Sequence, residues 1–179
     1  GDATRIPSPR STTSTSPITL ARRSTTPRGT GVRFNANRSG KLPYPELEAI
    51  LPQVAALNRN AIETAMKFDV HACTDVTGFG ILGHTLELAR GSDVQIDLIY
   101  QNLPFYPHAL RMYQKGENTG SNKANRKLAE GAWEISSDKS AEEQALLFDP
   151  QTSGGLLIAV HDSQADELIS QLKKEGIEA

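Results

Sequence analysis

The sequence predicts an α+β domain in which helices flank a mixed β-sheet. Three short segments have the apolar or alternating pattern of strands, namely residues 70–74, 94–99 and 156–160. Three longer segments repeat apolar residues at helical spacing, namely residues 53–67, 81–90 and 163–175. These strands and helices do not alternate regularly along the chain, and this order argues against a purely parallel sheet.

The first 28 residues differ from the rest in composition. Ser, Thr, Pro and Arg dominate them, and few apolar side chains are present to offset the entropy lost on ordering. We therefore expect residues 1–28 to be a basic tail or linker, with residues 1–17 poorly packed, and residues 29–179 to form one domain. A transit peptide and a nucleic-acid-binding arm are alternatives for the tail, although no aromatic side chains accompany its basic ones.

The remaining elements follow from local signals. Residues 45–51 predict a short helix, and Pro52 suits the first turn of the helix over 53–67 because a proline there loses no hydrogen bond. The apolar run over 70–74 predicts a buried strand. A glycine turn separates this strand from the helix over 81–90.

Two segments lie between the second and third predicted strands. A short helix is expected around residues 109–113, after two prolines. Residues 115–122 are rich in Gly, Asn and Ser, which is typical of an exposed loop.

The overall composition excludes several classes of protein. No apolar run approaches the roughly 20 residues of a membrane-spanning helix, so we expect no membrane association. The single cysteine, Cys73, forms no internal disulfide, and the chain lacks the Cys and His spacing of a zinc site. This cysteine usage predicts a reducing, cytoplasmic compartment. The charge is uneven, since eight Lys and Arg against one acid in residues 1–41 leave a net −9 on residues 42–179.

The first candidate site places a carboxylate between a strand and a helix. Asp75 ends the strand over 70–74, and Thr77, Gly78 and Gly80 form the turn that follows. An aspartate oxygen is a ligand that Mg²⁺ prefers, and the free N–H groups at the start of the next helix favour a phosphate. In the alternative interpretation, Asp75 or Thr77 only caps that helix and the glycines only permit the turn.

The second candidate site is the glycine-rich stretch of residues 148–155, which leads into the strand over 156–160. A strand follows it rather than a helix, so it is not a Walker-type phosphate loop. The hydroxyls of Thr152 and Ser153, with Gly154 and Gly155, either contact a ligand or bond their own backbone. The sequence does not decide between these two interpretations.

The other reactive side chains favour structural roles. His71 and His84 lack a second ligand at metal spacing and are expected to be core or surface histidines. Cys73, within a strand expected to be buried, is expected to pack as a small apolar residue. No residue of the chain is assigned as catalytic.

Four segments together resemble the selenophosphate synthetase (selenide, water dikinase) family. They are residues 57–59 (LNR), 72–80 (ACTDVTGFG), 82–84 (LGH) and 149–157 (DPQTSGGLL). The resemblance extends from about Thr30 to the C-terminus. It implies the C-terminal domain that this family shares with the aminoimidazole ribonucleotide synthetase superfamily.

The resemblance implies a reaction and partners. Such enzymes use ATP, water and selenide to make selenophosphate, AMP and phosphate, and they form homodimers through an N-terminal domain that binds ATP. The family's Cys or selenocysteine, its Lys, its glycine-rich loop and further metal-binding aspartates all precede the region present here. Only Asp75 carries over as a ligand of Mg²⁺, so the fragment alone is expected to be inactive.

The sequence departs from the family just before the Gly29–Gly31 segment. Where the family has Thr-Lys-Pro-Leu, this chain has Thr26 in place of the Lys and Arg28 in place of the Leu. These departures suggest a truncated, fused or divergent protein. A non-catalytic regulatory or interaction domain that keeps the fold is therefore the alternative to an enzyme domain.

Overall fold

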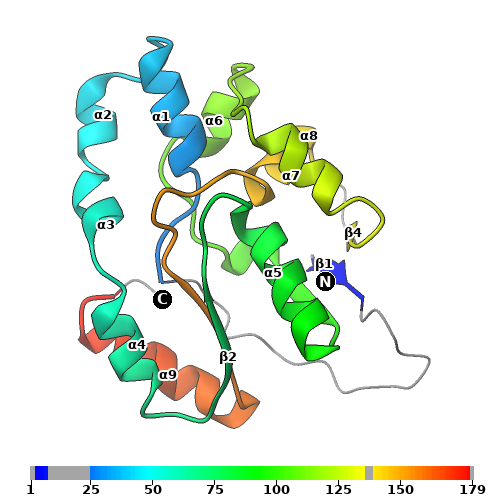
Figure 1. The fold of residues 1–179 in the computed structure, drawn as a ribbon. Coiled ribbons are helices and arrows are strands. Elements are labelled where there is room, and N and C mark those ends of the chain that lie inside the picture. The colour runs from blue at the N-terminus through cyan, green and yellow to red at the C-terminus, as the bar shows by residue number, and fades with distance from the viewer. Residues whose placement is uncertain (1–2, 8–24, 136–138, 178–179) are drawn as a thin grey trace.

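The computed structural model describes residues 3–7, 25–135 and 139–177 of the chain (Figure 1). The strands of these residues are β1 (Ala3–Ile6), β2 (Val70–Asp75), β3 (Ile96–Ile99), β4 (Glu134–Ile135) and β5 (Leu156–Val160). The helices are α1 (Thr30–Arg38), α2 (Tyr44–Glu48), α3 (Leu51–Ala55), α4 (Arg59–Ala65), α5 (Gly80–Ser92), the 3₁₀ turn η1 (Tyr100–Asn102), α6 (Ala109–Gln114), α7 (Asn122–Leu128), α8 (Ala141–Leu147) and α9 (Asp162–Lys174). None of them has the length and apolarity needed to cross a bilayer.

The strands form two small antiparallel sheets, one with the order β3-β1-β4 and one that pairs β2 with β5. The predicted α+β class is confirmed, and helices flank both sheets. The three predicted strands are also present, but they do not share one mixed sheet. The strand near 94–99 lies apart from the other two because it pairs with β1, a strand that the sequence did not indicate. The parallel pairing found in the described residues is an isolated bridge between Arg28 and Phe105.

For Ala3–Ile6, strand β1 corrects the prediction that residues 1–17 pack poorly. Ala3–Ile6 is the central strand of its sheet, with Ile6 opposite Ile96 and Thr4 opposite Leu98. Ile6 has no exposed surface and joins the apolar cluster around α5, and this burial offsets the entropy of ordering the strand. Residues 8–24 lie outside the described residues, so the boundary at residue 28 stays a prediction.

The core consists of three apolar clusters. One lies around α5 and includes side chains of β1, β3 and β5; a second joins α1, α2, α6 and α8; the third joins α4, α9 and β5. Strand β5 is buried along its whole length because Leu157 faces the first cluster while Ile158 faces the third. Figure 1 shows α4 and α9 beside one end of the β2–β5 pair and α1, α6 and α8 beyond the other end.

The helices differ from the prediction at several places. The predicted helix over 53–67 is two helices, α3 and α4, because Ala56 has an extended backbone conformation (φ −64°, ψ 136°). Pro52 lies in the first turn of α3, as expected. The helices over 81–90 and 163–175 are present as α5 and α9. The sequence did not predict α1, α7 or α8.

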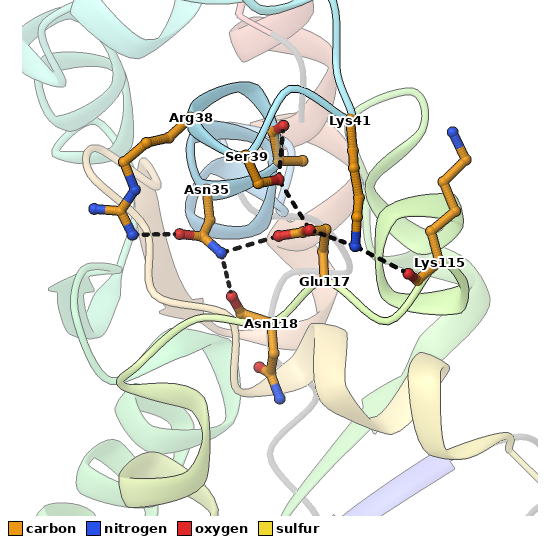
Figure 2. Close-up of polar contacts among 8 residues, drawn as sticks. Asn35, Arg38, Ser39, Lys41, Lys115, Glu117 and Asn118 are labelled. Atoms are coloured by element: carbon orange, nitrogen blue, oxygen red, sulfur yellow. Dashed lines mark hydrogen bonds and ion pairs between the residues drawn. The ribbon is translucent and has the colours of Figure 1, made fainter.

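Residues 115–122 are largely the exposed loop that their composition predicted, but Glu117 and Asn122 within it are buried. Glu117 is only 7% exposed and forms an ion pair with Lys41 Nζ at 2.7 Å (Figure 2). Its carboxylate also accepts hydrogen bonds from Ser39 Oγ (2.9 Å) and Asn35 Nδ2 (3.0 Å). The hydrogen bond from Lys41 holds the pKa of Glu117 below its usual value. This network fastens the segment after α6 to the C-terminal end of α1.

We predict that Ile6→Ala lowers the free energy of unfolding by about 2–4 kcal/mol, because it leaves a cavity in the cluster around α5. Ile99→Ala is the matched control, since Ile99 is 38% exposed on the neighbouring strand and should lose far less. Urea unfolding of both variants measures the difference. Equal, small effects would mean that β1 does not pack as described.

Candidate functional site

The two candidate segments of the sequence lie side by side. Beyond the last pair of β2 and β5, the Val76 N–H donates to the Gly155 carbonyl and Val76 accepts from the Gly154 N–H, both at 2.9 Å. One step further, the Gln151 N–H donates to the Thr77 carbonyl at 3.0 Å. The turn after β2 and the turn before β5 therefore form one structural unit at the end of the pair.

Asp75 is the last residue of β2 and is exposed, as predicted. No hydrogen bond or ion pair of its carboxylate is found with the other described residues. The helix-capping alternative is not what the structure has, because Phe79 occupies the N-cap of α5 and no side chain caps that helix. The described residues hold no cluster of three or more His, Cys, Asp or Glu that would bind a metal ion, so Asp75 is an isolated carboxylate.

The turn after Asp75 is rigidly held. The Thr77 N–H donates to Nε2 of His84 at 3.0 Å, so this amide already has an acceptor. Gly78 is exposed, and its carbonyl accepts from Asn125 Nδ2 at 2.8 Å. Gly80 has φ +72°, and a Cβ there would lie 2.8 Å from the Phe148 carbonyl carbon, so only glycine fits.

The turn before β5 divides into an exposed and a buried part. Thr152 is exposed and Ser153 is half-buried, and within the described residues neither hydroxyl bonds its own backbone. Gly154 and Gly155 are buried. A Cβ on Gly154 would lie 2.4 Å from the Val76 carbonyl oxygen, and one on Gly155 the same distance from Thr25 Oγ1, so both glycines serve close packing.

Sequence reasoning missed the role of Asp149, which is fully buried. Its Oδ1 accepts from Val32 N (2.9 Å) and the Tyr113 hydroxyl (2.7 Å), and its Oδ2 accepts from Gly31 N (3.0 Å) and Gln151 Nε2 (2.9 Å). Burial raises the pKa of Asp149 to about 6, while these hydrogen bonds act in the opposite direction. The carboxylate is therefore ionised at neutral pH and caps the N-terminus of α1.

Gln151 completes this cap. Its Oε1 accepts from the N–H groups of Gly29 (3.2 Å) and Thr30 (3.3 Å) and from the Thr30 hydroxyl (3.0 Å). Thr30 Oγ1 in turn accepts from the Thr152 N–H at 3.2 Å. The short Gly29–Gly31 segment is thus the partner of the second candidate segment. A helix start and a glycine-rich turn that lie about 120 residues apart form one network.

Arg28 lies beneath the same turn with no exposed surface. Its Nη1 donates to the Gly154 carbonyl, whereas Nε and Nη2 have no hydrogen-bond partner within the described part of the chain. Burial lowers the pKa of Arg28 to about 9, so the guanidinium is still charged at neutral pH. A buried cation without a carboxylate partner is costly.

Cys73 corrects a further expectation. Strand β2 is not buried; it alternates between half-buried and exposed residues, and Cys73 is exposed. Partial burial of the thiol, with the nearby charge of Asp75, raises the pKa of Cys73. The thiol is therefore mostly protonated at neutral pH, which does not suit a nucleophile. His71 is exposed and His84 is buried, in keeping with their expected structural roles.

Comparisons with known proteins identify the family to which most of the chain is similar. The family described as AIR synthase related protein, C-terminal domain, matches residues 28–179. A selenide, water dikinase of Pelobacter propionicus is 40% identical over 154 residues, which are 86% of this chain and 44% of that protein. Relatives of the same name from Clostridioides difficile and Treponema denticola are 37% and 35% identical over 85% and 84% of this chain. The chain thus spans less than half the length of these curated relatives.

We predict that Asp149→Asn destabilises the fold by about 1–3 kcal/mol, because an amide nitrogen would face hydrogen-bond donors in a buried site. Asp75→Asn is the matched control, since the same change at an exposed carboxylate leaves no donor unpaired. Chemical unfolding of the two variants makes the comparison. A loss no larger at Asp149 than at Asp75 would contradict the capping role.

We also predict that Arg28→Met stabilises the protein by about 1–4 kcal/mol, because an apolar side chain of similar length removes an uncompensated buried charge. Arg90→Met, on the exposed surface of α5, controls for the general effect of losing an arginine. The midpoints of urea unfolding measure both. A clear loss of stability in Arg28→Met would show that the bond to the Gly154 carbonyl outweighs the cost of burial.

Proposed function

Because this chain belongs to the family of AIR synthase related protein C-terminal domains, we propose that it is the C-terminal part of a selenide, water dikinase. The complete enzyme would use ATP, water and selenide to make selenophosphate, AMP and phosphate. The proposal places the enzyme in the cytoplasm. It also assigns ATP binding and homodimerisation to an N-terminal domain. The relatives are long enough to contain such a domain in addition to the matched region.

The observation that carries this proposal is the exposed carboxylate of Asp75 at the junction of the two candidate turns. Asp75 ends β2, and its side chain is free of hydrogen bonds to the described residues around it. A surface carboxylate beside two rigid turns is available to a separate domain that brings a nucleotide. This position supports a role as ligand of a Mg²⁺ ion shared with the ATP phosphates.

The residues present fit such an ion only in part. The carboxylate oxygens of Asp75 are hard ligands, and Mg²⁺ in phosphate-transfer sites is held by one or two carboxylates together with phosphates and water. When bound, the ion would neutralise charge on the phosphates. Asp75 supplies one such ligand, and we assign the remaining protein ligands to the N-terminal domain.

The same geometry separates the proposed nucleotide contacts into two groups. Thr77, Gly78, Gly80 and residues 152–155 were all expected near the ligand. The Thr77 N–H already has an acceptor, and Gly80, Gly154 and Gly155 are buried, so these would support the site rather than touch the nucleotide. We propose that direct contacts come from the N–H group of Gly78 and the hydroxyls of Thr152 and Ser153.

A non-catalytic regulatory or interaction domain is the second candidate. Arg28 favours it, since a buried, uncompensated charge stands where the resembled family has Leu. A chimera distinguishes the two functions, with residues 28–179 replacing the C-terminal domain of the Pelobacter propionicus relative. A folded but inactive chimera would favour the non-catalytic function.

We predict that the isolated chain forms no AMP from ATP in the presence of selenide, because catalysis of phosphoryl transfer depends on positioning a complete triphosphate site. The chimera, by contrast, should form AMP and selenophosphate. Selenide-dependent AMP release measures both. Turnover by the isolated chain would refute the proposal that catalysis needs the N-terminal domain.

In that chimera, Asp75→Asn should reduce turnover at least about 100-fold, because the amide keeps the shape of the side chain but removes a charged ligand of the metal. The melting temperature should change little, since the carboxylate is exposed. Thr74→Ser, a neighbouring conservative change, serves as the control. Normal turnover of Asp75→Asn, or a collapse in its melting temperature, would remove Asp75 from the metal site.

A further inference from the structure

His84 is a buried side chain of α5 with a specific task at the candidate site. It is 6% exposed and lies in the second turn of the helix. Its Nε2 accepts the Thr77 N–H at 3.0 Å and lies 3.2 Å from the Thr77 hydroxyl. On the opposite side of the ring, Nδ1 lies 3.0 Å from Oε2 of Glu87. The ring thus bridges the turn after Asp75 and the exposed surface of α5.

These contacts fix the protonation state of the ring. A backbone N–H only donates, so Nε2 must present a lone pair to Thr77. The single ring proton then lies on Nδ1 and is donated to the carboxylate of Glu87, an acceptor. His84 is therefore neutral, and the Nδ1–H tautomer is the form that satisfies both neighbours.

The ring of His84 is buried and packs against an aromatic neighbour. The Phe79 ring lies over His84, with centroids 5.6 Å apart and planes tilted by 45°. This approach requires glycine at position 83, because a Cβ there would lie 2.6 Å from the Phe79 Cβ. The acceptor for Thr77 is thus built into α5 and shielded, and a hydrogen bond gains strength in such surroundings.

The rest of the turn is fixed from other directions. The Val76 N–H donates to the Gly155 carbonyl, and the Val76 carbonyl accepts from the Gly154 N–H. The Thr77 carbonyl accepts from the N–H groups of Gly80 and Gln151. Asn125 Nδ2, also buried, bridges the carbonyls of Gly78 and Phe148 at 2.8 and 3.0 Å. His84 supplies the acceptor for the Thr77 amide. Without His84, the Thr77 N–H would have no hydrogen-bond acceptor just beyond the end of β2.

We propose that His84 is a positioning residue for this site: its neutral imidazole holds the Thr77–Gly78 turn and so fixes the course of the chain directly after Asp75. Glu87 selects the tautomer that makes this possible. The consequence for turnover rests on the proposed function, whereas the hydrogen bond and the tautomer do not. The two parts are therefore tested separately.

The first test uses NMR spectroscopy of the 179-residue chain. At about pH 8, where a histidine of ordinary pKa is neutral, ¹H–¹⁵N spectra of the imidazole should show the proton of His84 on Nδ1. Glu87→Ala removes the partner of that proton and should produce a measurable fraction of the Nε2–H tautomer, with faster hydrogen exchange at the Thr77 amide. A ring protonated on Nε2 in the unaltered chain would overturn the proposal.

The second test compares replacements of His84. His84→Phe keeps a ring but has no acceptor, whereas His84→Gln places an amide oxygen near the position of Nε2. Exchange of the Thr77 amide should be at least about tenfold faster in His84→Phe than in His84→Gln. His71→Phe, at an exposed position of β2, is the control and should leave that amide unchanged. Equal exchange in both His84 variants and the unaltered chain would overturn the proposal. If His84→Phe does not fold, Glu87→Ala decides the question.

The third test is the turnover of the chimera. His84→Phe should lower kcat about 10- to 100-fold, which is the usual effect of removing a group that supports a metal ligand. His84→Gln should restore part of this loss. If the unaltered chimera is inactive, the proposed function fails while the NMR tests still decide the role of His84. If the chimera is active and both variants match it, His84 does not position the site.

Discussion

The buried carboxylate of Asp149 is the constraint on which the surrounding structure depends. A desolvated negative charge persists only where enough donors converge on it, and here two amides of α1, a tyrosine hydroxyl and a glutamine amide do so. Each donor comes from a segment that must be in place at the same time. The requirement therefore ties the start of α1, the end of α6 and the turn before β5 into one arrangement.

The candidate site inherits its rigidity from that arrangement. Gln151 belongs both to the cap of α1 and, through its own N–H, to the turn that contains Thr77. Asp75 itself makes no contribution to this network and remains exposed. The Asp75 carboxylate, which can bind a ligand, is thus attached to two turns that hydrogen bonds hold in place. This combination favours precise placement of a ligand over adaptability.

Sequence patterns predicted the elements whose signals are local. The strands at β2 and β5, the helices α5 and α9, and the exposure of Asp75 at the end of its strand all follow from periodicity and turn residues. Helix α8 was missed although its capping box of Ser140 and Glu143 is a local signal.

Helix α1 and strand β1 were missed for a different reason, because their partners are distant in sequence. The caps of α1 come from Asp149 and Gln151, and the neighbour of Ile6 is Ile96. The acceptor role of His84 likewise depends on a turn and a helix meeting in space.

The pairing of the strands has a consequence for how the chain folds. Asp75 pairs with Leu156 and Ile6 with Ile96, so the innermost contacts of the β2–β5 and β1–β3 ladders close loops of 81 and 90 residues, respectively. The entropy of closing such loops must be overcome before any ladder contact stabilises the chain. We therefore expect the helices to form early and the two sheets late. The capped start of α1, which joins segments about 120 residues apart, should be among the last native contacts to form.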